Sequence, residues 1–253
     1  MKRYAWLLLL LLIGQPALAD SDGGTCAATI ELSTLLPPPP AAGSAAAQHD
    51  LQVVLATQQS RTQADMDAAK ADTERSVFRF ADVLGPGLQP KSLPKTSAFF
   101  DRLLKCDKAT VKDAKNVWKR QRPAAVSDQV HPLAKEKADD WSYPSGHATF
   151  GYSTAVLLAN MLPEKRAAIF ERADVYAQHR IVMGAHFPSD IAAGRMAGTL
   201  IAAQWLDHRA MRADFEAARA ELRQTLGLPI APPAPASATG DGDTSHSPTR
   251  PAQ

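Results

Sequence analysis

The residues of this sequence best suited to chemistry lie between positions 115 and 190. They comprise three cations, a Ser-Gly-His turn, and a histidine with an aspartate four residues after it: Lys115, Arg122, Ser145, Gly146, His147, Arg180, His186 and Asp190. Phosphoryl transfer depends on positioning and on stabilising negative charge, and cations grouped around an anion provide both. Together these residue types predict a phosphate site that contains a nucleophile.

The turn Pro144-Ser145-Gly146-His147 suits an anion because it precedes an apolar run that reads as a helix. A helix that begins at glycine exposes backbone N–H groups, and the helix dipole favours a negative charge there. The Ser145 hydroxyl is a further donor, and His147 beside the anion can give a proton near neutral pH. Taken alone, the run is also ordinary turn chemistry.

His186 and Asp190 have the spacing of an oriented histidine. A carboxylate four residues after a histidine can accept its Nδ1–H, which leaves Nε2 unprotonated and available for attack. Two structural alternatives remain open at this point. Asp190 can be a first-turn acid favoured by the helix dipole, and His186 can be a buried core histidine.

Lys115 and Arg122 are seven residues apart, which predicts that they lie near one face of a helix, two turns from each other. Arg122 precedes a proline and is therefore expected at a helix end. The alternative is a solvated basic face, because Lys112, Lys119 and Arg120 belong to the same segment.

The order Lys-x6-Arg-Pro, Pro-Ser-Gly-His and Arg-x5-His-x3-Asp resembles the signature of the type 2 phosphatidic acid phosphatase (PAP2) superfamily, which includes vanadium haloperoxidases and the bacterial class A non-specific acid phosphatases. The closest resemblance is to the class A enzymes, because the segments 35–40 and 76–85 also look like their N-terminal regions. The resemblance covers roughly Leu35 to Trp205. One departure is His179, which precedes Arg180 where the family usually has serine.

The resemblance implies an acid phosphatase that hydrolyses small phosphomonoesters through a phosphohistidine, without a metal or another cofactor. In that scheme His186 attacks phosphorus, Asp190 orients His186, and His147 protonates the leaving group. Five residues would bind the phosphoryl oxygens: Lys115, Arg122, Ser145, Gly146 and Arg180. The alternatives are a vanadate-dependent haloperoxidase and a phosphate-binding module without turnover. His179 is either a second titrating group near the site or an outward-facing helical histidine.

The N-terminus reads as a secretory signal peptide over residues 1–19. It has a basic start, an apolar run from Trp6 to Ile13 and an Ala-x-Ala cleavage site. We therefore expect a periplasmic protein that does not insert in a membrane once the signal is removed. Cys26 and Cys106 are the two cysteines of the chain, and export predicts that they form a disulfide.

The rest of the chain predicts an all-α, single-domain helical bundle over residues 48–228. Helices are expected around residues 76–81, from a cap at Ser145 to about Leu162, from Pro163 to a close at Gly184, and after a cap at Ser189. Residues 20–47 are expected to form an irregular arm, and the Pro/Ala/Ser-rich residues 229–253 a disordered tail. Removal of Lys2 and Arg3 takes the formal charge from +2 to 0, so the charge gives no indication of a nucleic-acid partner. A homodimer is possible for a helical phosphatase of this size.

Overall fold

The computed structural model describes residue 26, residues 30–135 and residues 140–230, and these contain helices and no strand. The predicted all-α fold is therefore confirmed. The signal peptide and most of the predicted tail lie outside the described residues. The α-helices are α1 (Leu32–Leu35), α2 (Ala45–Ser60), α3 (Gln63–Ala71), α4 (Ala81–Leu84), α5 (Pro94–Trp118), α6 (Pro123–Val126), α7 (Gly146–Met161), α8 (Arg166–Val182), α9 (Pro188–Asp207) and α10 (Arg212–Thr225). Single 3-10 turns are η1 (Val77–Phe80), η2 (Pro90–Ser92), η3 (Pro163–Lys165) and η4 (Arg209–Met211).

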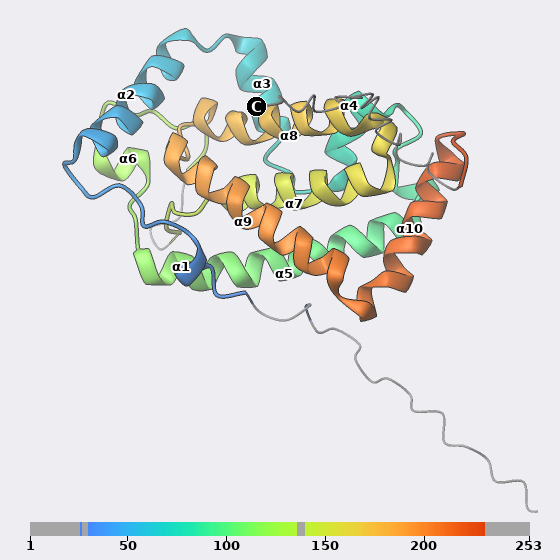
Figure 1. Cartoon of the computed structure of the whole chain (residues 1–253). Coiled ribbons are helices and arrows are strands. Elements are labelled where there is room, and N and C mark those ends of the chain that lie inside the picture. The colour runs from blue at the N-terminus through green and yellow to red at the C-terminus, as the bar shows by residue number, and fades with distance from the viewer. Residues whose placement is uncertain (1–25, 27–29, 136–139, 231–253) are drawn as a thin grey trace, which may run out of the picture.

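Helix α7 runs through the centre of the molecule, with α8 on one side, α5 on the other and α9 packed along it (Figure 1). Its sequence is apolar or small almost all round, as expected for a helix surrounded by protein. Only Gly146, His147, Val156 and Asn160 are not fully buried. The first two of these lie at its N-terminus, which is therefore the end of the central helix that is open to ligand.

Two glycines let α9 approach α7 closely. A Cβ on Gly198 would lie 2.3 Å from the Thr149 carbonyl oxygen, and one on Gly194 would lie 2.7 Å from the Ser145 carbonyl oxygen. Any larger side chain would push the helices apart. Because Asp190 is in the first turn of α9, this contact sets the position of Asp190 relative to the N-terminus of α7.

Several helix boundaries differ from those predicted. The expected arm contains α1 and the first turn of α2. The segment expected as a second helix around residues 76–81 forms η1 and the start of α4, and α3 lies before it. Ser189 was expected to cap the last core helix, but that helix begins one residue earlier, at Pro188, with Phe187 as N-cap. Proline is favoured at this first position because its missing N–H has no partner there in any case.

Cys26 and Cys106, which the sequence predicts to pair, are joined by a disulfide with a Cα–Cα distance of 5.5 Å. The bond ties the N-terminal arm to α5, where Cys106 is buried in the main core. None of the helices in the described residues is both long and apolar enough to cross a membrane.

Candidate active site

A cavity of about 520 Å³ opens at the N-terminus of α7. Six of the eight predicted site residues line it: Lys115, Arg122, Gly146, His147, Arg180 and His186. The other two, Ser145 and Asp190, are fully buried and lie behind this lining. Residues from α5, α7, α8 and the α8–α9 link therefore meet at one cavity, as the spacing of the three motifs predicts.

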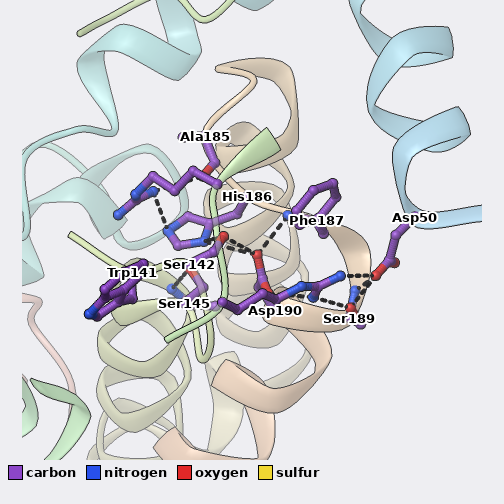
Figure 2. Close-up of polar contacts among 12 residues, drawn as sticks. Asp50, Trp141, Ser142, Ser145, Ala185, His186, Phe187, Ser189 and Asp190 are labelled. Carbon is purple, nitrogen blue, oxygen red and sulfur yellow. Dashed lines mark hydrogen bonds and ion pairs between the residues drawn. The ribbon is translucent and has the colours of Figure 1, made fainter. Parts of the chain in front are cut away.

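His186 lies in the link between α8 and α9 and is 1% exposed. Its Nε2 is 3.2 Å from Arg122 Nη1, and its Nδ1 is 3.3 Å from Asp190 Oδ2 (Figure 2). Arginine can only donate, so Nε2 is the acceptor and Nδ1 carries the proton. Burial, and then the charges of Arg122, Lys115 and Arg180, hold the pKa of His186 well below its usual value. The ring is therefore neutral, with its lone pair on the nitrogen beside Arg122.

Asp190 is held rigidly behind His186. Its Oδ2 accepts hydrogen bonds from Ser142 Oγ at 2.5 Å and from the Phe187 N–H at 2.8 Å. Its Oδ1 is 2.6 Å from Arg120 Nη1. Burial raises the pKa of Asp190, and the Arg120 charge and the hydrogen bonds oppose that rise. Both oxygens are occupied, so the carboxylate is fixed in the orientation that faces His186.

The alternative of a solvated basic face is wrong for Arg120. Its side chain is 10% exposed and bridges Asp190 and Asp50, with its second nitrogen 2.7 Å from Asp50 Oδ2 (Figure 2). It also donates to Ser189 Oγ at 2.6 Å, and the Ser189 hydroxyl in turn bonds to Asp50. Asp50 belongs to α2, so the N-terminal part of the chain supports the histidine through Arg120 and Asp190.

Lys115 and Arg122 do not share a helix face, because α5 ends at Trp118 and Lys119 adopts a left-handed conformation with φ 46°. Arg122 instead caps the short helix α6. The two cations are brought together by Asp140, whose Oδ1 is 2.8 Å from Lys115 Nζ and whose Oδ2 is 2.7 Å from Arg122 Nη2. Both cations therefore hold a carboxylate where the predicted ligand is a phosphate.

Ser145 is the N-cap of α7, and its Oγ accepts from the Ala148 N–H at 3.4 Å. Its own N–H donates to the Asp190 carbonyl at 3.0 Å. The residue therefore shapes the turn from behind the cavity lining, and Gly146 is the member of the pair that lies in the lining. The predicted contact between the Ser145 hydroxyl and phosphate stays a prediction.

His147 follows at the cavity wall, with Nε2 3.0 Å from the carbonyl oxygen of Thr73. A carbonyl can only accept, so Nε2 carries a proton and Nδ1 is the second titrating atom. Burial, and then the charges of Arg180 and Arg75, hold the pKa of His147 well below its usual value. The Thr73 carbonyl thus fixes both the ring and its tautomer.

His179 is neither a cavity residue nor an outward-facing one. Its Nδ1 is 2.6 Å from Oδ2 of the fully buried Asp72, which also binds Arg172 and Arg79 at 2.7 and 2.9 Å. These partners hold the pKa of Asp72 below its usual value against the effect of burial. Asp72 directly precedes Thr73, so the residue that replaces the family serine anchors the segment to which His147 bonds.

Sequence reasoning missed Arg75, Arg120, Asp140, Ser142 and the Thr73 carbonyl. The charged residues among them lie close to a motif or to the segment that resembles the family, but closeness in sequence does not distinguish a charge of the site from a solvated one. Ser142 lies two residues before the Pro-Ser-Gly-His turn, and its type and position are equally ambiguous. The Thr73 carbonyl had none, because every residue carries such an oxygen and its partner is 74 positions away.

Residues 104–212 match the PAP2 superfamily. An acid phosphatase of Zymomonas mobilis subsp. mobilis is 37% identical over 186 residues, which are 70% of this chain and 69% of the relative. A non-specific acid phosphatase of Salmonella typhi is 29% identical over 167 residues, 63% of this chain and 66% of the relative. A transmembrane PAP2 type phosphatidylglycerolphosphate phosphatase from Bacillus subtilis, a solved structure, has a TM-score of 0.46 and 20% identity over 67% of this chain and 86% of that chain. On the first two of these findings, the chain belongs to the PAP2 superfamily and, within it, to the acid phosphatases.

Proposed function

We propose that this acid phosphatase is exported to the periplasm and hydrolyses a broad range of phosphomonoesters through a phosphohistidine on His186. The observation that carries the mechanism is the tautomer and orientation of the His186 ring. Its Nε2 is unprotonated beside Arg122, and its Nδ1 faces an aspartate that Ser142, the Phe187 N–H and Arg120 hold in place. A site that only binds phosphate has no need of an oriented nucleophile.

In the first step His186 Nε2 attacks phosphorus, an N–P bond forms, and the ester P–O bond breaks. The leaving oxygen takes a proton from His147 Nδ1, since Nε2 of that ring is engaged by Thr73. In the second step His147 Nδ1 accepts a proton from water, the oxygen of that water bonds to phosphorus, and the N–P bond breaks. Inorganic phosphate leaves and His186 is neutral again.

Negative charge on the phosphoryl group would be stabilised by Lys115, Arg122, Arg180 and the N–H groups at the start of α7. These groups can supply the stabilisation that a divalent cation would give, so we propose turnover that persists in EDTA. A bound phosphate dianion also raises the pKa of His147, which favours the protonated form that the first step needs.

Two variants and a burst measurement test the assignment of the two histidines. His186→Ala should abolish turnover of every substrate, because no intermediate forms. His147→Ala should lose on the order of 10²–10⁴-fold on an alkyl phosphate, whose leaving alkoxide needs the proton. With p-nitrophenyl phosphate the same variant should release a burst of p-nitrophenol and then stall, carrying an acid-labile phosphate on His186.

The matched control is His49→Ala, which removes an exposed histidine of α2 outside the cavity and should behave as wild type. The assignment is reversed if His147→Ala loses all substrates equally without a burst while His186→Ala depends on the leaving group. Oxidation of bromide by peroxide in the presence of vanadate, with no ester hydrolysis, would instead indicate a haloperoxidase.

Export is supported by the N-terminal sequence and by the Cys26–Cys106 disulfide, since such bonds persist in oxidising compartments. N-terminal sequencing of the periplasmic protein should give a mature chain that begins near Asp20. Material that begins at Met1 would contradict this.

A further inference from the structure

The cavity has a second set of cations outside the predicted phosphate clamp, by which we mean Lys115, Arg122, Ser145, Gly146 and Arg180. Arg75, Lys108 and Lys112 line it together with the clamp residues and with Lys135, which lies on the loop that follows α6. None of the three forms a hydrogen bond or ion pair with any residue that the structure describes. Lys115 and Arg122, by contrast, are both paired with Asp140. Arg75, Lys108 and Lys112 are therefore available to an added anion.

Arg75 is the member of this set that lies against the N-terminus of α7. Its Nη1 lies 3.3 Å from the point that a Cβ of Gly146 would occupy, so its guanidinium packs against the first residue of α7. Its positive charge also acts on His147, the proposed donor to the leaving group. Arg75 is thus on the side of the cavity where His147 lies, and this is the side from which the alcohol part of a substrate leaves.

The segment that carries Arg75 is firmly held, so the guanidinium is presented from a fixed backbone. Asp72 is bound by Arg172, Arg79 and His179, and the Thr73 carbonyl is bound by His147. The Glu74 carbonyl accepts from the Tyr176 hydroxyl at 2.8 Å. Burial lowers the pKa of Arg75, which indicates that its charge has been partly removed from water. A cation held in this way gains from an anionic ligand.

Lys108 and Lys112 extend the second set along α5. Lys112 lies one turn and Lys108 two turns before Lys115 on the same helix face, because the successive residues are four and three positions apart. At 1.5 Å per residue, Lys112 is about 4.5 Å and Lys108 about 10 Å from Lys115 along the helix axis. An anion that contacts these residues would therefore lie roughly 5–10 Å along α5 from the part of the cavity that Lys115 lines.

We propose that Arg75, Lys108 and Lys112 form a second anion subsite that binds a carboxylate or phosphate on the leaving portion of the substrate. Resting on the phosphatase function above, this predicts a preference for phosphomonoesters whose alcohol part is itself acidic, such as phosphorylated hydroxy acids and bisphosphates. A phosphoryl group in the clamp and a second anion near Arg75 together match the distribution of charge around the cavity.

The test compares two substrates that differ in charge at the leaving portion. Glycerol 3-phosphate and 3-phosphoglycerate both release a primary alkoxide, and only the second carries a carboxylate. Wild-type kcat/KM should be higher for 3-phosphoglycerate. In Arg75→Gln the loss on 3-phosphoglycerate should exceed the loss on glycerol 3-phosphate on the order of tenfold, a factor equivalent to about 1.4 kcal/mol. The paired variant Lys108→Gln/Lys112→Gln should shift the ratio in the same direction.

Lys105→Gln is the matched control, because it removes an exposed cation of α5 that does not line the cavity. It should leave the substrate ratio at the wild-type value. Added salt should reduce the wild-type preference, since charges at an open cavity are screened. Equal losses on both substrates in Arg75→Gln would overturn the proposal and assign Arg75 to the phosphoryl group, and an unchanged ratio in all variants would also overturn it. Neither result bears on the phosphatase function, which hydrolysis of glycerol 3-phosphate by the wild type tests separately.

Discussion

At the residue scale, the side chain with the least expected position is Asp140. Its carboxylate bridges Lys115 and Arg122 with both oxygens, and these two cations hold its pKa at about 2 against the effect of burial. It is therefore ionised at any working pH. An incoming phosphate has to displace this carboxylate or share the two cations with it.

Asp140→Asn should strengthen the binding of inorganic phosphate. The amide cannot balance the two positive charges, so both are left for the ligand. The side chain is 45% exposed, and a pair of this kind contributes up to about 1 kcal/mol. We expect the inhibition constant for phosphate to fall by up to about fivefold, measured by product inhibition, while Asp128→Asn, an exposed acid outside the cavity, leaves it unchanged. Weaker inhibition would mean that Asp140 positions the cations more than it competes for them.

The two histidines predict an acidic pH range. His186 has to be neutral to attack, and the neutral form of a histidine predominates above its pKa. Burial and cations lower that pKa, so attack is lost only at a pH well below the usual value of about 6.5. His147 has to be protonated, and its lowered pKa moves the basic limit in the same direction. The acid limb of kcat/KM should therefore lie well below 6.5, and a limb at or above that value would contradict the assignment.

Which residues could be predicted depended on how strictly chemistry limits their type. Phosphate binding calls for cations and an oriented histidine, so the side chains of the three motifs could be identified from type and spacing. Arg120 could not, because a charge in a basic run usually faces solvent and its partner Asp50 is 70 positions away. The role of Asp140 depends on tertiary contacts that no local pattern records.

At the scale of elements, helix periodicity predicted α7, α8 and α9 to within a residue or a short 3-10 turn. The end of α5 was not predictable, because the left-handed residue there is Lys119 where glycine or asparagine is usual. That break places Arg122 on a new helix and turns it toward His186. The geometry of the clamp thus depends on the left-handed backbone conformation of Lys119, which its residue type does not predict.

The contact between α7 and α9 should be intolerant of a single added methyl group. In Gly198→Ala the new Cβ would meet the Thr149 carbonyl, so α9 has to shift and Asp190 shifts with it. We expect a loss of stability of about 1–3 kcal/mol in urea unfolding, together with a lower kcat. Met196→Ala, on the exposed face of the same helix, should change stability by less than about 0.5 kcal/mol. If Gly198→Ala behaves like this control, the close approach is not needed.

At the scale of the whole molecule, the disulfide connects the N-terminal arm to the core across 80 positions of sequence. Closing a loop of that length restricts the unfolded chain, which the chain-entropy treatment values at about 4–5 kcal/mol. The double variant Cys26→Ser/Cys106→Ser should therefore unfold at a clearly lower urea concentration than the oxidised wild type. Reduced wild-type protein should behave like the variant, and identical midpoints for all three would show that the bond adds no stability.

The link from α2 to the catalytic aspartate has a consequence for how the molecule folds. Asp50 bonds to Ser189 across 139 positions and to Arg120 across 70, so the support of Asp190 joins three distant parts of the chain. Contacts of such long sequence separation form only after the intervening chain has been ordered. Recovery of hydrolysis during refolding should accordingly lag behind the recovery of helical circular dichroism. A nascent chain whose helix α9 is still inside the ribosome would already contain every residue of the clamp. Asp190 would not yet be in place to orient His186.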